Sequence, residues 1–184
     1  MIISLIEFFR LVVVTFALGY IFSSSIKLPK DIEDFYKGFD WGNIKIAVAI
    51  AAPAVLLHEL GHKFTALAFG INAEFFASYL GLGIGVLLRL INSPLLLFVP
   101  GYVNIANATS VQSMIIAFMG PFMNLLLWIG AFLLLKYRHY NAKASIILYA
   151  TKRINMILFI FNMLPIPPFD GFKVLSGLFG SFGF

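Results

Sequence analysis

Four long hydrophobic runs alternate with shorter, more polar segments along the chain. They cover residues 2–22, 44–69, 111–135 and 144–164. Each run provides about the 20 apolar residues that an α-helix needs to cross a hydrocarbon core roughly 30 Å thick. The pattern therefore predicts an α-helical multi-pass membrane protein with about four transmembrane helices.

The segment between the second and third runs, residues 71–107, is also hydrophobic but is interrupted by residues that break helices. These residues are Gly81, Gly83, Gly85, Pro94, Pro100 and Gly101. Such frequent glycine and proline disfavour one long helix and favour short strands or a re-entrant hairpin. Non-helical backbone at membrane depth survives only where protein or a water-filled cavity satisfies its polar groups. We therefore expect a membrane-embedded β-hairpin or short sheet that packs against the second helix.

This pattern divides the chain into three segments. Residues 1–43 are expected to form a transmembrane helix and a polar interfacial loop, residues 44–171 a membrane core, and residues 172–184 a short C-terminal segment that cannot span a bilayer. The first run is interpreted as a retained helix and not as a signal peptide, because it lacks a basic start and contains Glu7 and Arg10.

Composition supports the membrane assignment and narrows the partners. The chain is 61% hydrophobic and 11% charged, which lies outside the usual range of soluble globular domains. Its net charge of +5 comes from lysines and arginines placed mostly in short loops, a pattern that fits lipid headgroups better than nucleic acid. We expect a multi-pass protein of the cell membrane that contacts the lipid bilayer and binds no nucleic acid. Cysteine is absent, so any metal ion must be held by nitrogen and oxygen ligands.

The second hydrophobic run contains His58, Glu59 and His62 in the motif H-E-x-x-H. On a helix, side chains at positions i and i+4 project from the same face, so both imidazoles can bind one metal ion. The glutamate between them can accept a proton from water and pass it to a leaving amine. An ordinary polar patch is the alternative, but ionisable groups in a spanning helix cost a few kcal/mol each on insertion scales. The motif therefore predicts a catalytic zinc site.

Two histidines leave a catalytic zinc ion one protein ligand short. Asp170 is the best candidate, because it is the only aspartate after Asp40 and follows a proline-rich turn that can aim a carboxylate into a cavity. Taken alone, however, the sequence Pro-x-Asp-Gly is typical of a simple turn. His139 lies in a basic loop and is expected to be solvated, and Glu74 follows the end of the second helix too closely to fold back.

Two segments together resemble the paired motifs of the site-2 protease family of intramembrane zinc metalloproteases. They are His58-Glu59-Leu60-Gly61-His62 and Asn162-Met163-Leu164-Pro165-Ile166-Pro167-Pro168-Phe169-Asp170-Gly171. The resemblance implies one Zn²⁺ ion per chain with His58, His62 and Asp170 as its ligands. It implies that Glu59 is the catalytic acid and base, and that Asn162 positions substrate or stabilises the oxyanion.

The resemblance covers about residues 44–171 and adds two weaker matches. Gly120-Pro121-Phe122-Met123-Asn124 resembles another family element, which makes Asn124 a candidate substrate or oxyanion residue; a helix-packing hydrogen bond is the other interpretation. Residues 75–88 are the expected match to the membrane-embedded β-hairpin of the family, whose edge could hold an extended substrate by strand addition. Residues 89–107 would then be extra length before the third helix.

The implied activity is hydrolysis of peptide bonds in transmembrane helices of membrane-protein substrates. The alternatives are a membrane metal-binding or transport protein without proteolytic activity, and a catalytically silent relative. Glu59 argues against both, because a transporter needs no catalytic base and a silent relative would be expected to have lost part of the motif. Orientation is left open: the basic loops at residues 27–37 and 136–143 count as cytoplasmic by the positive-inside rule, whereas the resemblance implies that they lie outside. Neither the identity of the substrate nor the oligomeric state follows from the sequence.

Overall fold

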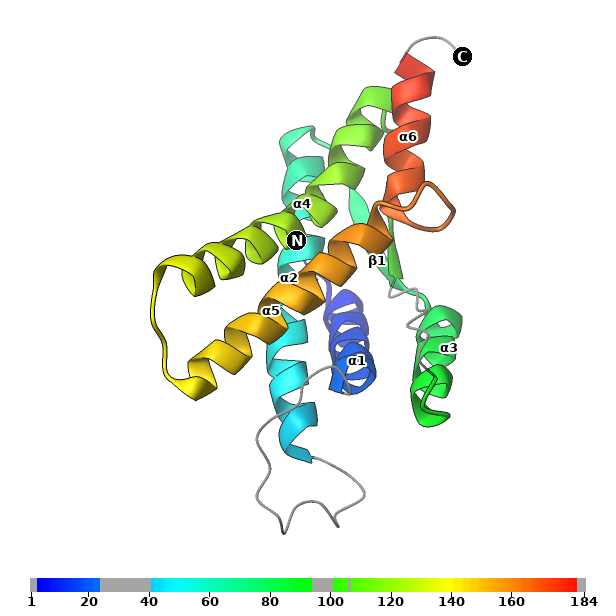
Figure 1. The fold of residues 1–184 in the computed structure, drawn as a ribbon. Coiled ribbons are helices and arrows are strands. Elements are labelled where there is room, and N and C mark those ends of the chain that lie inside the picture. The colour runs from blue at the N-terminus through cyan, green and yellow to red at the C-terminus, as the bar shows by residue number, and fades with distance from the viewer. Residues whose placement is uncertain (1–2, 24–40, 94–100, 106, 182–184) are drawn as a thin grey trace.

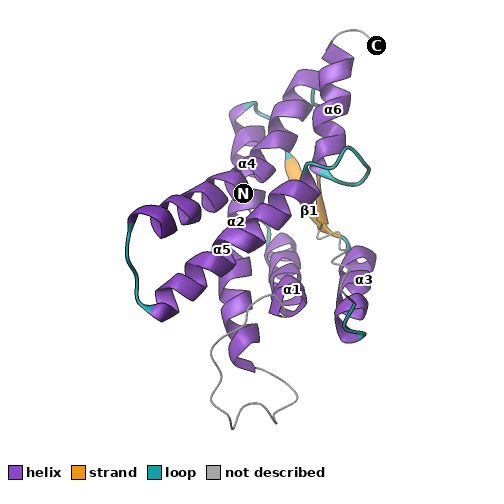
Figure 2. Ribbon diagram, in the orientation of Figure 1, coloured by secondary structure: helices purple, strands orange, loops and turns teal. Residues whose placement is uncertain are grey.

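The computed structural model describes residues 3–23, 41–93, 101–105 and 107–181, and most of them are helical (Figures 1 and 2). In chain order the elements are α1 (Leu5–Phe22), α2 (Trp41–Ala68), β1 (Ala73–Ala77), α3 (Tyr79–Leu90), β2 (Gly101–Ile105), α4 (Ser110–Tyr137), α5 (Ala142–Asn162) and α6 (Asp170–Ser181). The polar loop predicted before the second hydrophobic run lies largely outside the described residues.

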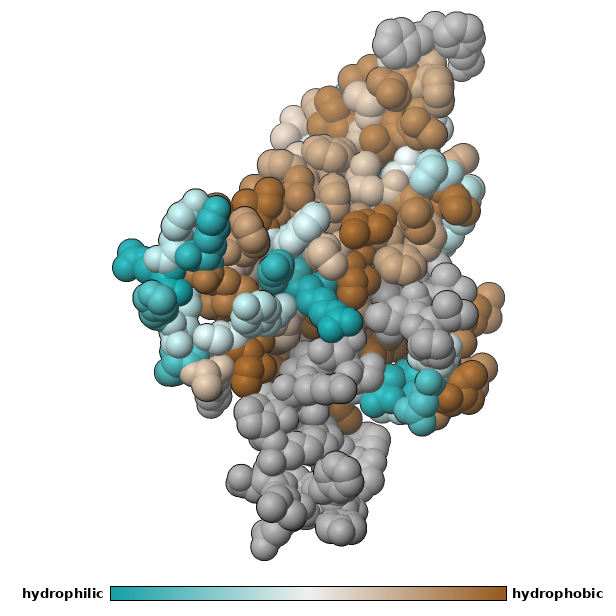
Figure 3. All heavy atoms as spheres, viewed as in Figure 1, coloured by the Kyte–Doolittle hydropathy of each residue, from teal (hydrophilic) through white to brown (hydrophobic). Residues whose placement is uncertain are grey.

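Four helices, α1, α2, α4 and α5, are long and apolar enough to cross a membrane. They coincide with the four hydrophobic runs, which confirms the predicted helical multi-pass architecture. Each helix also exposes large apolar side chains, for example Phe16, Phe64, Leu126 and Ile160. Hydrophobic residues accordingly cover much of the visible surface in Figure 3. Such a surface is unfavourable in water and suits a lipid environment.

The predicted short sheet is present, but its two strands are not the ones expected. β1 and β2 pair antiparallel, with Phe75 opposite Val103. Helix α3 lies between them in the sequence, so most of the hairpin predicted at residues 75–88 is helical. The segment 89–107, expected to be extra length, contains the second strand. The hairpin boundaries predicted from the sequence are therefore wrong, although the sheet itself is confirmed.

Helix α3 continues through the glycines that were predicted to interrupt a helix. The side chain of Ser78 caps the helix by accepting a hydrogen bond from the backbone N–H of Gly81 at 3.3 Å. The buried residues of α3 are Gly81, Leu82 and Gly85, which share one helical face, and the helix packs against α1. Small residues at a helix interface let backbones approach closely, and membrane helices tolerate glycine for this reason.

Helix α2 occupies the centre of the molecule and contacts α1, α4 and α5 (Figure 1). It lies close to α1 at Gly19, where an added Cβ would lie 2.3 Å from a methyl carbon of Val48. The same apolar core continues to Phe75 and Val103 of the sheet and to Ile154 of α5. Helix α6 packs along α4. This arrangement brings the first turn of α6 to the part of α2 that carries the H-E-x-x-H motif.

Candidate metal centre

Helix α2 presents His58 and His62 one turn apart at its contact with α4, and both side chains are buried. Glycines on both helices make this contact possible. A Cβ at Gly61 would lie 2.6 Å from the carbonyl oxygen of Met119, and a Cβ at Gly120 would lie 2.1 Å from His62 Nε2. The imidazole of His62 therefore occupies space that any side chain at position 120 would need.

Asp170 is the first residue of α6 and is buried against the same two histidines. Its Oδ2 atom lies 3.2 Å from His58 Nε2 and 3.3 Å from His62 Nε2. The two Nε2 atoms are 3.1 Å apart. The structure thus brings together the three residues that the sequence singled out as ligands, in a group able to hold a metal ion.

Hydrogen bonds on the far side of each imidazole decide which ring nitrogen carries the proton. His58 Nδ1 donates to Asn124 Oδ1, and His62 Nδ1 donates to the backbone carbonyl oxygen of Ile116, both at 2.7 Å. Carbonyl oxygens only accept hydrogen bonds, so each Nδ1 holds its proton. In the neutral form of each ring, Nε2 therefore keeps a lone pair, and both Nε2 atoms face Asp170.

The donor set fits a zinc ion. Two imidazole lone pairs and a carboxylate converge on one point, and their mutual repulsion is relieved by a cation between them. Ligand atoms bound to a tetrahedral zinc at about 2.0–2.1 Å lie about 3.3–3.4 Å from one another. The three observed separations are 3.1, 3.2 and 3.3 Å. Two nitrogens and one oxygen are also a usual protein ligand set for catalytic zinc.

The charges of this region bear on Asp170 and on Lys173, which follows it by one turn of α6. Asp170 contributes a buried carboxylate at the start of that turn. Burial lowers the pKa of Lys173, while the negative charges of Asp170 and Glu59 oppose that shift. The Lys173 ammonium group therefore senses the charges of the metal centre.

Glu59 is buried beside the two imidazoles, and its Oε2 atom has no hydrogen-bond partner within the described part of the chain. It lines a cavity of about 10 Å³ together with His58, Asn124 and Asn162, among others. A space of this size holds about one water molecule. A buried carboxylate oxygen without a partner, next to a space for water, is placed to accept a proton.

Asn124 contacts the metal centre through His58 Nδ1, the ring nitrogen that does not face Asp170. While its Oδ1 accepts from His58, its Nδ2 donates to the backbone carbonyl of Ala54 at 3.2 Å and to Asn155 Oδ1 at 2.9 Å. These bonds fix the orientation of the amide and, through it, of the His58 ring. Asn155 was not predicted from the sequence, where its signal is an amide within an apolar spanning helix, a place in which polar groups are rare and usually have a role. The structure shows that this amide is fully buried.

The two other candidate ligands considered from the sequence lie elsewhere. His139 is exposed in the loop between α4 and α5. Glu74 is exposed on β1, where its carboxylate pairs with Arg10 of α1 at 2.8 Å. Neither side chain belongs to the buried group of donors.

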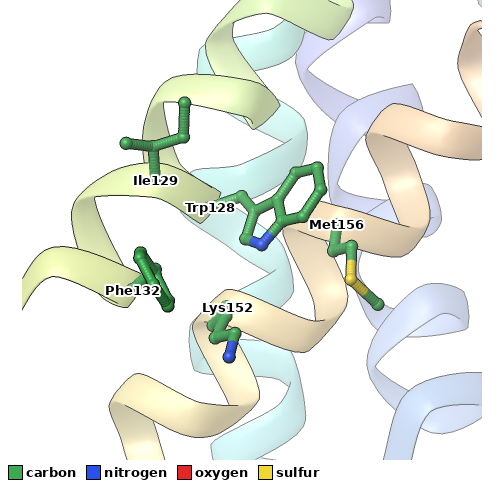
Figure 4. A pocket seen from close by; sticks show the side chains of 5 residues that line it. All are labelled: Trp128, Ile129, Phe132, Lys152 and Met156. Atoms are coloured by element: carbon green, nitrogen blue, oxygen red, sulfur yellow. The ribbon is translucent and has the colours of Figure 1, made fainter. Parts of the chain in front are cut away.

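A larger pocket lies between α4 and α5, away from the metal centre. Its volume is about 370 Å³, and its lining residues are Trp128, Ile129, Phe132, Lys152 and Met156 (Figure 4). The Lys152 ammonium group lies 5.2 Å from the centre of the Phe132 ring. None of the donor residues lines this pocket.

Comparisons with known proteins agree with this geometry. The profile described as peptidase family M50 matches residues 46–140 and 136–183. A candidate zinc metalloprotease of Methanocaldococcus jannaschii is 35% identical over 145 residues, which are 75% of this chain and 75% of that protein. Another of Synechocystis sp. is 27% identical over 141 residues, 77% of this chain but 33% of the longer relative.

No solved structure gives a significant match to the chain. The family profile, however, covers most of the described core, including both segments that supply the donor residues. The relative from Methanocaldococcus jannaschii shares three quarters of each chain. The chain therefore belongs to peptidase family M50, the site-2 protease family of metalloproteases.

Proposed function

We propose that this protein is an intramembrane zinc endopeptidase that hydrolyses peptide bonds in transmembrane segments of other proteins of the cell membrane. The observation that carries the proposal is the convergence of three donors and an unpaired carboxylate oxygen of the described residues. Two of the donors and the carboxylate lie on α2, a helix apolar enough to span a bilayer, and Asp170 of α6 is the third donor. Ionisable groups at such a position are costly, and a catalytic role accounts for their presence. Membership of a metalloprotease family supports the same chemistry.

His58, His62 and Asp170 would hold one zinc ion. When bound, zinc supplies a Lewis acid that polarises the scissile carbonyl and lowers the pKa of water to about 7. Glu59 takes the proton of the attacking water at its free Oε2 atom and then donates it to the departing amine. Because Glu59 and the imidazoles are buried, bulk water is largely excluded from the site.

Two asparagines are proposed to assist in different ways. Asn162 lines the same small cavity as Glu59, so its amide is placed to donate to the oxygen that becomes negative in the transition state. Asn124 was expected to be a substrate or oxyanion residue. Its amide is already engaged with His58, Ala54 and Asn155, which supports a positioning role instead.

The substrate must reach this site with its scissile carbonyl exposed. A helix hides its carbonyl groups in hydrogen bonds, so the segment to be cut has to be at least locally extended. The sheet of β1 and β2 is the element that can hold an extended segment by strand addition.

A single pair of variants tests the proposal. The chain is purified in detergent, zinc is counted by mass spectrometry, and cleavage of a synthetic transmembrane peptide is followed. Glu59→Gln is expected to keep zinc and lose cleavage by about 10²–10⁴-fold, since it removes the general base. His139→Ala, which changes an exposed histidine, is the matched control and should keep both properties. Zinc binding without cleavage in the unaltered chain would contradict proteolysis and support the metal-binding alternative.

A further inference from the structure

The outer edge of β1 is closed by side chains of α1. The backbone N–H of Phe75 donates to Glu7 Oε1 at 2.8 Å, and the backbone carbonyl of Phe75 accepts from Arg10 at 2.7 Å. These are the groups that an added strand would need on this side. Glu7 is itself buried and paired with Lys63 at 2.6 Å, which holds it in place. An extended segment therefore finds no free backbone groups at the centre of this edge.

The pairing register directs the corresponding groups of β2 to the opposite edge. Phe75 faces Val103 across the sheet, and its backbone groups point away from β2 toward α1. Phe75 and Val103 thus form a non-hydrogen-bonded pair, in which the backbone groups of both residues face outward. The N–H and C=O of Val103 consequently lie on the edge of β2 that no other strand of the described residues covers.

The carbonyl of Val103 is occupied by Lys173, whose ammonium group donates a hydrogen bond to it. Lys173 follows Asp170 by three residues on α6, so the two side chains share one side of that helix. The edge of β2 therefore faces the first turn of α6, the turn that supplies the carboxylate of the metal centre. A segment paired with Val103 would run alongside that carboxylate.

We propose that Lys173 is a gate residue, which occupies the Val103 carbonyl in the resting protein and is displaced when the backbone of an extended substrate pairs with β2. The proposal rests on the proposed proteolytic function, because it identifies where and how the substrate of that reaction docks. The lysine side chain stands in for one N–H group of the substrate.

A gate of this kind weakens substrate binding, because a hydrogen bond to a charged group must be broken first. Lys173→Met keeps the length and apolar character of the side chain but cannot donate. It is expected to bind an extended peptide roughly ten-fold more tightly, the low end of what a charge-assisted hydrogen bond contributes. Lys173→Arg keeps a donor and is expected to bind like the parent. Lys136→Met removes one positive charge at the exposed end of α4 and serves as the control.

The experiment measures binding separately from cleavage. All variants are made in the zinc-loaded Glu59→Gln protein, and a short fluorescent peptide of alternating valine and threonine is titrated in detergent while its anisotropy is followed. The same peptide with an N-methyl group on every amide lacks the donors needed for strand addition at either edge. The gain from Lys173→Met is expected with the first peptide and should vanish with the N-methylated one.

Two results would overturn the gate. Unchanged or weaker binding by Lys173→Met would show that Lys173 is a strut between α6 and the sheet, and an equal gain with the N-methylated peptide would show that the backbone of the peptide does not pair with β2. In the active chain, Lys173→Met is expected to lower KM and leave kcat nearly unchanged if Lys173 is a gate. If Lys173 is a strut, the same substitution should raise KM or lower kcat. If the binding pattern holds but the unaltered chain cuts no peptide, the proteolytic function fails and the gate stands.

Discussion

Two buried polar clusters lie side by side on α2, and they differ in how completely their groups are paired. The first, the ionic cluster, joins Lys63 to Glu7 of α1 at 2.6 Å. The carboxylate of Glu7 also accepts the backbone N–H groups of Ser4 and Phe75, at 2.9 and 2.8 Å. Opposite charges and backbone donors therefore satisfy this cluster without any added ligand.

The metal centre, only one residue away on the same helix, is not satisfied in this way. His58, His62 and Asp170 direct electron pairs at one another, and Glu59 keeps an oxygen without a partner in the described part of the chain. The comparison teaches that burial of charge does not by itself mark a functional site. The metal centre is distinguished by hydrogen-bond acceptors that outnumber the donors around them and therefore need a cation. In the neighbouring ionic cluster every charge is paired.

The largest difference between the clusters should appear when Asp170 is replaced by alanine. The two imidazoles that remain cannot complete a zinc site, so bound zinc and peptide cleavage should both fall below detection. Folding should not suffer, because the substitution removes a group that is repelled in the absence of the ion. Zinc per chain and the free energy of unfolding of the metal-free protein are the measurements. Full zinc occupancy in Asp170→Ala would remove this residue from the ligand set.

The ionic cluster should respond in the opposite way. Lys63→Met leaves the buried carboxylate of Glu7 without its counter-charge and is expected to lower the free energy of unfolding by about 3–5 kcal/mol. Zinc per folded chain should stay the same. The double variant Glu7→Gln with Lys63→Met removes both charges and should recover much of the loss, as reversible unfolding in mixed detergent can show. A double variant no more stable than Lys63→Met would contradict a direct pairing.

A smaller effect is expected from the amide that holds His58. Asn124→Ala removes the acceptor of the imidazole N–H and should weaken zinc binding about 10–100-fold, as is usual for groups that orient a metal ligand. Asn155→Ala acts only through Asn124 and should weaken zinc binding less. Competition with a fluorescent zinc chelator measures both. No loss in Asn155→Ala, beside the expected loss in Asn124→Ala, would mean that the amide of Asn124 does not need Asn155 for its orientation.

The smallest effect on stability and zinc content is expected from a change at His139, which belongs to neither cluster. His139→Ala changes an exposed side chain and should alter the free energy of unfolding by no more than about 0.5 kcal/mol. Zinc content should stay unchanged. A loss of zinc in this variant would mean that His139 contributes to zinc binding.

The spanning helices and the donor residues could be predicted because each depends on a local pattern. Hydrophobic run length indicates a transmembrane helix, and the spacing of His58 and His62 places both on one face whatever else surrounds them. The assignment of Asp170 as the third ligand depended on the family resemblance, because the sequence of its turn does not indicate how close it lies to α2. The sequence could not supply the ionic cluster, since nothing local pairs Glu7 with a lysine 56 positions further along.

The error at α3 has a different origin. Gly81 and Gly85 were taken as helix breakers, as they would be in water, whereas here they let α3 approach a neighbouring helix. Strand β2 was hidden for a related reason, because its pairing with β1 depends on a return of the chain over more than twenty residues. The gate lysine was invisible as well, since its acceptor is a backbone carbonyl and any residue at position 103 provides one.

The glycine at position 120 has a consequence for how such a protein could lose its activity. Because a single methyl group there would lie 2.1 Å from the zinc-facing nitrogen of His62, alanine at this position would compete with the ion for the same space. Alanine is otherwise the residue best suited to the interior of a helix. One small and helix-compatible change could therefore disrupt the metal centre while His58, His62, Asp170 and Glu59 all remain in the sequence.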